Sequence, residues 1–252
     1  MSSLAAHAET LRALHQRGNP LVLPNVWDAA TAGLVAEAGF PVVATSSSAV
    51  ANSLGFPDGE QAPADEVFAA VRRVAKAVDL PVTADVEAGY GLDAEQLVAA
   101  LLDAGAVGIN LEDTDHTATA GGLREPGWQA ERLARIRKAA DAVGVPVVIN
   151  ARVDVFIRSG DPDRHADVFA EGVERAKRYL DAGADCVYPI MLAEPLIGEF
   201  VRKVDAPVNI MFKSTGPSVS ELGDLGVARI SLATGVWRAS LQAVRDLLAG
   251  LR

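Results

Sequence analysis

The chain alternates short, continuous apolar runs with longer stretches in which apolar residues recur at helical spacing. Continuous apolar runs of this length are typical of strands that are buried on both faces of a parallel sheet. The sequence therefore predicts strands at Leu21–Leu23, Pro41–Thr45, Pro81–Asp85, Val107–Leu111, Pro146–Ala151, Cys186–Pro189, Pro207–Met211 and Arg229–Leu232. The stretches between them predict helices, for example at Trp27–Ala38, Ala64–Val78, Ala94–Ala104, Gln129–Val143 and His165–Ala182.

Glycine follows several of the expected helices, as at Gly39, Gly105, Gly144 and Gly183. Glycine readily takes the left-handed conformation that ends a helix. Repeated strand–helix units in a chain of 252 residues favour an α/β fold, a closed (β/α)8 TIM barrel. A doubly wound open sheet is the structural alternative. We expect Met1–Gly18 to add a helix before the first strand, and residues 1–252 to form a single domain.

Composition and net charge limit which kinds of binding partner and which cellular compartment we expect. The net charge of −10 argues against a nucleic-acid partner, which would require a basic face. No apolar run approaches the roughly 20 residues that a membrane helix needs, and no signal peptide is recognisable. A single cysteine, Cys186, excludes an intramolecular disulfide and favours a reducing compartment, so we expect a cytoplasmic protein.

Carboxylates gather where the third and fourth predicted strands end. In a TIM barrel the active site lies at the C-terminal ends of the strands. Asp85 and Glu87 close the third strand, and Glu112 follows the fourth. Several carboxylates at close range require a cation or raised pKa values, and Mg²⁺ or Mn²⁺ with oxygen ligands would satisfy them. The alternative for each acid is a helix cap or a solvated loop charge.

Other strand ends carry groups that could bind an anionic substrate. Arg152 could bind a substrate carboxylate through a bidentate pair of hydrogen bonds. Alternatively, it could form a structural salt bridge to Asp154 or Glu112. The run Ser46–Ser48 offers hydroxyl and backbone N–H donors, although serine clusters are usually loops. His116 is either an acid–base group or a solvated loop side chain.

Five segments of the chain resemble the isocitrate lyase/phosphoenolpyruvate mutase superfamily. They are the residues Pro24-Asn25-Val26-Trp27-Asp28-Ala29, Gly55-Phe56-Pro57-Asp58, Pro81 to Gly91, Gly108 to Asp113, and Ile149 to Asp154. The resemblance implies a Mg²⁺-dependent enzyme that acts on small 2-oxo acids or related carboxylates. Members break or form a C–C or P–C bond beside a pyruvate-like unit, through an enolate held on the metal.

The resemblance also assigns roles by position. It implies that Asp85 binds the metal, with Asp58, Glu87 and Glu112 holding it directly or through its waters. The candidate catalytic residues are Arg152, Glu112 and Asp58. The implied substrate-binding residues are Ser46, the backbone of Ser47, Arg152, Asp28 and Asn209.

Departures from the family pattern limit the expected chemistry. Glu87 replaces the second Asp of the usual Asp-x-Asp, and Ser46-Ser47 replaces a Ser-Gly pair. The segment Thr117–Leu123 lacks both the Lys and the catalytic Cys of the family's gating loop. We therefore do not expect isocitrate lyase activity. We expect a lyase or hydrolase that cleaves a C–C bond of an oxaloacetate-type 2-oxo acid, and the stretch Asp115–Gly127 could close over the site.

Three alternatives stay open at this point. They are a mutase or hydrolase acting on the P–C bond of phosphonopyruvate, a different metal-dependent aldolase barrel, and a degenerate barrel that only binds a carboxylate. Because family members swap a C-terminal helix, we expect a homo-oligomer, a dimer or a tetramer. Here one final helix is expected at Gly235–Leu251, which leaves swapping open.

Overall fold

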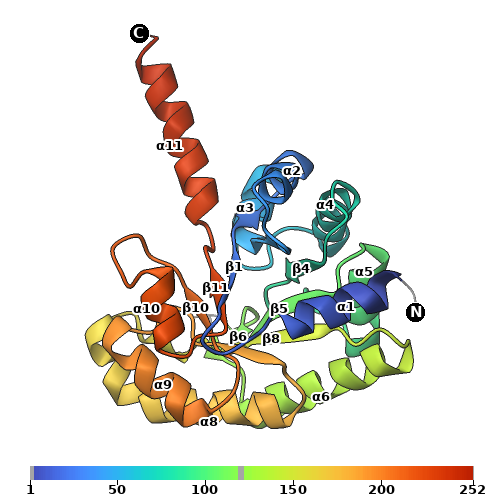
Figure 1. Cartoon of the computed structure of the whole chain (residues 1–252). Coiled ribbons are helices and arrows are strands. Elements are labelled where there is room, and N and C mark those ends of the chain that lie inside the picture. Colours follow the sequence, from blue (N-terminus) through green and yellow to red (C-terminus); the bar gives the residue numbers. More distant parts are fainter. Residues whose placement is uncertain (1–2, 119–121, 252) are drawn as a thin grey trace.

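The computed structural model of the chain describes residues 3–118 and 122–251 (Figure 1). Within these residues, parallel strands form two hydrogen-bonded sheets, ordered β2-β3-β4-β5-β8-β9 and β1-β11-β10. The isolated bridge between Val187 and Val208 joins β9 to β10, and β1 runs into β2 across Pro24. The sheets therefore close into a (β/α)8 barrel, as predicted. The strands are β1 (Leu21–Leu23), β2 (Asn25–Val26), β3 (Val43–Thr45), β4 (Val82–Asp85), β5 (Gly108–Glu112), β8 (Val148–Arg152), β9 (Cys186–Tyr188), β10 (Asn209–Met211) and β11 (Arg229–Ser231).

Helices connect the strands and cover the outside of the barrel (Figure 1). The longer ones are α2 (Ala29–Glu37), α4 (Ala64–Lys76), α5 (Ala94–Asp103), α6 (Pro126–Ala142), α8 (His165–Asp181) and α9 (Ile197–Val204). Helix α3 (Ser47–Leu54) is as long as α9, and shorter pieces are α7 (Val155–Ser159), α10 (Val219–Asp224) and the 3₁₀ turns η1 (Pro162–Arg164) and η2 (Glu194–Leu196). A small antiparallel hairpin, β6 (Thr114–Asp115) with β7 (Gly122–Leu123), follows β5.

The predicted strands and helices are confirmed, with shifts at their ends. The strands expected to begin at Pro41, Pro81, Pro146 and Pro207 begin one or two residues later. Proline has no N–H to donate to a ladder, so it precedes these buried strands rather than joining them. At the other end, the ladder extends to Glu112 in β5 and to Arg152 in β8, where the two residues are paired in register.

The expected N-terminal helix is present as α1 (Ser3–Ala13). Its Ala8 and Leu11 are fully buried in one apolar cluster with Leu21, Val107 and Val148, which lie at the starts of their strands. Close packing there requires Gly108, because a Cβ at that position would lie 2.6 Å from Leu11. Helix α1 therefore closes the bottom of the barrel, and the opposite end is left for the site.

The last helix, α11 (Gly235–Ala249), projects away from the barrel, and the C-terminus lies at its tip (Figure 1). None of its residues is buried, and Val244, Leu247 and Leu248 are more than half exposed. The expected homo-oligomer stays a prediction. No helix among the described residues is long and apolar enough to cross a membrane.

Candidate active site

Asp85 is held rigidly at the end of β4. Its Oδ2 accepts hydrogen bonds from the backbone N–H of Ser47 at 3.0 Å and from the Ser47 hydroxyl at 2.8 Å, while Oδ1 accepts from Asn110 Nδ2 at 2.9 Å. Asn110 is the residue paired with Asp85 in the β4–β5 register, so the ladder itself brings the two side chains together. These three donors fix the orientation of the carboxylate.

Glu87 lies on a strained turn beside Asp85. Its φ is +48°, in the left-handed region that non-glycine residues seldom occupy. Glu87 accepts hydrogen bonds from the backbone N–H of Glu60 at 2.6 Å and from the Tyr90 hydroxyl at 3.0 Å. Burial and the nearby charges of Asp58, Asp85 and Glu112 raise the pKa of Glu87 to about 7. Strain and a displaced pKa at one buried residue are common signs of a functional site.

Asp58 completes the acidic group. It lies between α3 and α4, and burial together with the charge of Asp85 raises its pKa. Asp58, Asp85 and Glu87 thus repel one another at close range without a compensating cation among them. This is the electrostatic state that a divalent cation would relieve.

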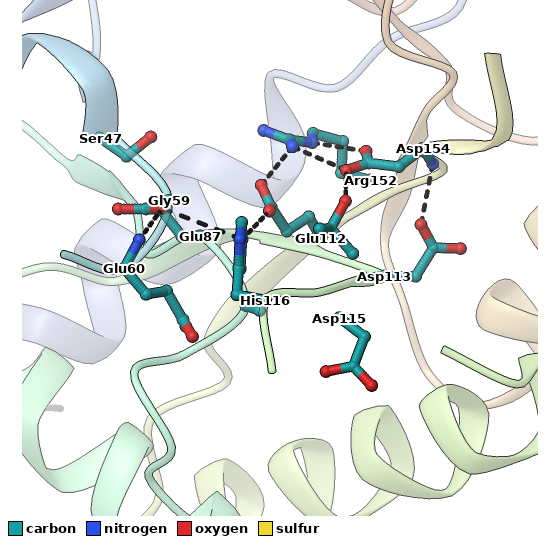
Figure 2. A network of polar contacts seen from close by, with 12 residues as sticks. Ser47, Gly59, Glu60, Glu87, Glu112, Asp113, Asp115, His116, Arg152 and Asp154 are labelled. Atoms are coloured by element: carbon teal, nitrogen blue, oxygen red, sulfur yellow. Dashed lines mark hydrogen bonds and ion pairs between the residues drawn. The ribbon is translucent and has the colours of Figure 1, made fainter. Parts of the chain in front are cut away.

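Glu112 and Arg152 form the second half of the site (Figure 2). Arg152 forms an ion pair with Glu112 and donates from Nε and Nη2 to Asp154 at 2.6 and 2.7 Å. His116 Nε2 lies 2.6 Å from the other Glu112 oxygen, Oε1, and this hydrogen bond raises the pKa of His116. The structural salt bridge considered for Arg152 is therefore present on both proposed partners, Asp154 and Glu112. Arg152 still lines the cavity, so its role as substrate clamp stays a prediction.

A buried network behind the site fixes Asp154. Asp113 accepts a hydrogen bond from the Asp154 backbone N–H at 2.8 Å, from the Tyr179 hydroxyl at 2.6 Å and from Arg175 at 3.1 Å. Asp113 and Asp154 are fully buried. Arg175 and Tyr179 belong to α8, so this helix holds the Arg152–Asp154 pair from outside the barrel.

A cavity of about 260 Å³ opens at this end of the barrel. The residues that line it come from most of the strands and from the loops that follow them. They include Asn25, Ser46, Ser47, Asp58, Thr83, Asp85, Asn110, Arg152, Tyr188, Arg229 and Ser231. A second hollow, lined by Glu87, Glu112 and His116, shares Ser47, Asp58 and Arg152 with the first. The two hollows therefore form neighbouring parts of one polar site.

The donor set fits a Mg²⁺ ion that keeps much of its water. Among the described residues, no group of three or more His, Cys, Asp or Glu side chains is arranged to hold an ion by itself. Mg²⁺ is usually bound by one or two carboxylates, with waters and substrate oxygens completing its shell. Asp85 is suited to direct contact, and Asp58 and Glu87 to contact through water. Glu112 is already engaged by Arg152 and His116. The metal assignment stays a prediction in this form.

The structure places two of the predicted substrate-binding residues away from the cavity. Asp28 is exposed and forms the N-cap of α2, where its side chain accepts from the Thr31 N–H at 2.8 Å. The prediction for Asp28 is corrected, because this aspartate begins the helix instead of facing the barrel axis. Asn209 is fully buried and donates to Ser231 at 3.1 Å, so it reaches the cavity wall through Ser231.

Ser46 and Ser47 open helix α3, a segment for which serine content alone favours a loop. Ser46 is the N-cap of this helix, and both polar groups of Ser47 donate to Asp85. Binding of a substrate carboxylate by this pair stays a prediction. The contacts of Ser47 in the structure therefore make it a residue that positions Asp85.

Comparison with known proteins now assigns the family. The family model described as phosphoenolpyruvate phosphomutase matches residues 11–252. An uncharacterized protein of Mycobacterium tuberculosis is 33% identical, over 91% of this chain and 84% of the relative. The 2-methylisocitrate lyase of Escherichia coli is 29% identical, over 99% of this chain and 86% of the lyase. A solved Burkholderia cenocepacia structure, provisionally named a phosphonomutase, superposes with a TM-score of 0.90 at 38% identity, over 96% of this chain and 99% of that one.

The chain belongs to the phosphoenolpyruvate phosphomutase family. It is an enzyme of the isocitrate lyase/phosphoenolpyruvate mutase superfamily, as its sequence motifs predict. Thr119, Ala120 and Gly121 lie outside the described residues, so closure of the stretch Asp115–Gly127 stays a prediction.

Sequence reasoning missed several residues of the phosphomutase-family site. Asn110, Thr83, Tyr188 and Arg229 all line the cavity, and none of them stands immediately after a predicted strand. Their side chains point inward from within the strands, alternating with residues that face the helices. The signal that could have found them is the presence of polar residues inside otherwise apolar runs, as with Thr83 and Asn110.

The raised pKa of Glu87 gives a pH prediction for the metal-free enzyme. Below its ordinary pKa of 4.5 the carboxyl is protonated in both the folded and the unfolded chain. Between pH 4.5 and about 7 only the folded chain retains the proton, so the free energy of unfolding falls as the pH rises through this window. Urea unfolding in EDTA should show a shallower pH slope for Glu87→Gln than for the wild type. Equal slopes would contradict the shift.

Proposed function

We propose that the protein is a Mg²⁺-dependent lyase or hydrolase that cleaves a C–C bond in a small 2-oxo acid, with oxaloacetate-type substrates favoured. The observation that carries the proposal is the position of the half-buried, donor-fixed carboxylate Asp85 and of the Arg152–Glu112–His116 group on two adjoining hollows that share Arg152. When bound, Mg²⁺ would act as a Lewis acid on the 2-oxo and carboxylate oxygens and stabilise the charge that develops as the bond breaks.

Residues of this chain would orient the groups of the site, stabilise the developing charge and deliver a proton. Ser47 and Asn110 keep the Asp85 carboxylate oriented. Arg152 supplies a fixed positive charge at the cavity wall for a substrate carboxylate or developing anion. The short Glu112–His116 hydrogen bond holds a proton at Nε2, because the neighbouring carboxylate raises the pKa of the imidazole. We assign to His116 the delivery of that proton to the departing carbon, in place of the Lys and Cys missing from Thr117–Leu123.

The main alternative is cleavage of the P–C bond of phosphonopyruvate, which the name of the Burkholderia relative supports. The 2-methylisocitrate lyases support C–C cleavage. The absence of Lys and Cys from the segment Thr117–Leu123 separates this chain from the lyases that use such a loop, so 2-methylisocitrate itself is not the expected substrate.

A substrate screen tests the proposal. The purified chain is assayed with oxaloacetate, its alkylated relatives, phosphonopyruvate and 2-methylisocitrate, each in EDTA, in Mg²⁺ and in Mn²⁺. We expect metal-dependent consumption of an oxaloacetate-type acid. Turnover of phosphonopyruvate would favour the P–C alternative, and rapid cleavage of 2-methylisocitrate would refute the argument from the missing Cys. Full activity in EDTA would point to a different kind of barrel enzyme. Inactivity on every acid despite tight Mg²⁺–oxalate binding would indicate a degenerate binding barrel.

A further inference from the structure

Arg229 is a buried cation without a counter-ion. It is the first residue of β11 and is 2% exposed. Within the described residues, its guanidinium makes no hydrogen bond or ion pair, and both Nε and Nη1 are buried donors without an acceptor. A buried charge in this state is costly unless a partner is supplied. The other buried arginines of the site, Arg152 and Arg175, each contact two carboxylates.

The groups around Arg229 do not neutralise it. His15 is neutral at physiological pH, because burial and the charge of Arg229 lower its pKa to about 4. The Cys186 thiol is also neutral, since burial raises its pKa to about 12. Asp85 acts on Arg229 electrostatically without contact, and its carboxylate is already held by Ser47 and Asn110.

The same part of the cavity contains further polar groups without partners. Arg229 lines the cavity together with Asn25, Thr83 and Tyr188. The Asn25 Oδ1, the Thr83 Oγ1 and the Tyr188 hydroxyl are all buried and make no hydrogen bond with described residues. Hydroxyl groups can donate as well as accept, so Thr83 and Tyr188 can join Arg229 in binding an anion. The interior of the barrel therefore contains a preformed polar subsite that lies deeper in the barrel than Asp85.

We propose that Arg229 determines substrate specificity by binding one anionic group of a small dianionic substrate, such as a dicarboxylate, which extends from the Asp85 side into the barrel. The proposal rests on the proposed function, because it names the second charged end of the substrate of that site. A guanidinium donates charge-assisted hydrogen bonds to a carboxylate, and these are stronger than hydrogen bonds between neutral groups. The cavity of about 260 Å³ accommodates a short-chain acid and excludes a large one.

Binding of succinate and of its monoamide, succinamate, tests this inference. The two probes have similar size, and succinamate lacks one negative charge. Calorimetry on the wild-type chain should show a preference for succinate of about tenfold to a hundredfold, as expected for one charge-assisted contact. In Arg229→Met the preference should disappear, and Arg229→Lys should retain part of it. Arg202→Met, which removes an exposed arginine of α9, is the matched control and should retain all of it.

Two further measurements separate a binding role from a structural one and from the proposed function. Because Arg229 stabilises no described group, Arg229→Met should not lower the thermal midpoint, whereas a structural arginine would. Each titration is repeated in EDTA and in Mg²⁺, so that metal dependence and Arg229 dependence are read independently.

Equal affinity of the wild type for the two probes, or an unchanged preference in Arg229→Met, would overturn the inference even if the enzyme cleaves 2-oxo acids. Loss of preference without any turnover would uphold it and leave the proposed function refuted.

Discussion

Asp85→Asn is expected to reduce kcat/KM at least about a thousandfold, which corresponds to about 4 kcal/mol of transition-state stabilisation. The substitution removes the charge that would bind the metal but keeps the shape of the side chain. The single carbonyl oxygen of Asn can still accept from both donors of Ser47, so only the hydrogen bond from Asn110 is lost and the backbone of the β4 end should be preserved. Calorimetric titration with Mg²⁺ should show a loss of affinity of comparable size, and circular dichroism should be unchanged.

Asp93→Asn is the matched control for this prediction. Asp93 is an exposed N-cap at the start of α5, where its side chain accepts from the Gln96 N–H at 2.8 Å. Asparagine caps helices about as well as aspartate, so both stability and activity should be retained. If Asp85→Asn kept more than a tenth of the activity together with Mg²⁺ binding, the metal would have to be assigned to other residues.

Arg175→Met is expected to destabilise the folded chain by about 3–5 kcal/mol, because it leaves the fully buried Asp113 without its cation. The pKa of Asp113 is already raised to about 6, mainly by burial and then by the charge of Asp154. For a chain of this size, such a loss corresponds to a fall in the thermal midpoint of roughly 6–20 °C. The measurement is calorimetric or spectroscopic unfolding at pH 7.

The same helix provides the control. Arg178 forms an exposed ion pair with Glu174 at 3.0 Å, one turn along α8. Exposed pairs at this spacing contribute only about 0.3–0.5 kcal/mol, so Arg178→Met should change the midpoint by little more than the error. Equal effects of the two substitutions would show that the Asp113 network is not the source of the stability. Since Asp113 also accepts from the Asp154 backbone, Arg175→Met should in addition weaken the positioning of Arg152.

The order of the strands follows from the sequence because each strand is a local apolar run. A buried parallel strand must be apolar on both faces, and the helix that follows must show one apolar stripe. These local patterns and the glycines that follow several of the helices are enough to predict the barrel. The strand-end rule then places Asp85, Glu112 and Arg152 at one end, because all parallel strands point the same way.

The contacts within the site were decided by the tertiary structure alone. Register pairs Asp85 with Asn110 and Glu112 with Arg152, and no local pattern specifies register between strands far apart in sequence. Asp28 is a different case, because it caps α2 through a local hydrogen bond with Thr31. Arg229 is the clearest case. In the sequence it is one charge at the edge of an apolar run, and only closure of the barrel turns it inward, where it lines the cavity and burial leaves its Nε and Nη1 without an acceptor.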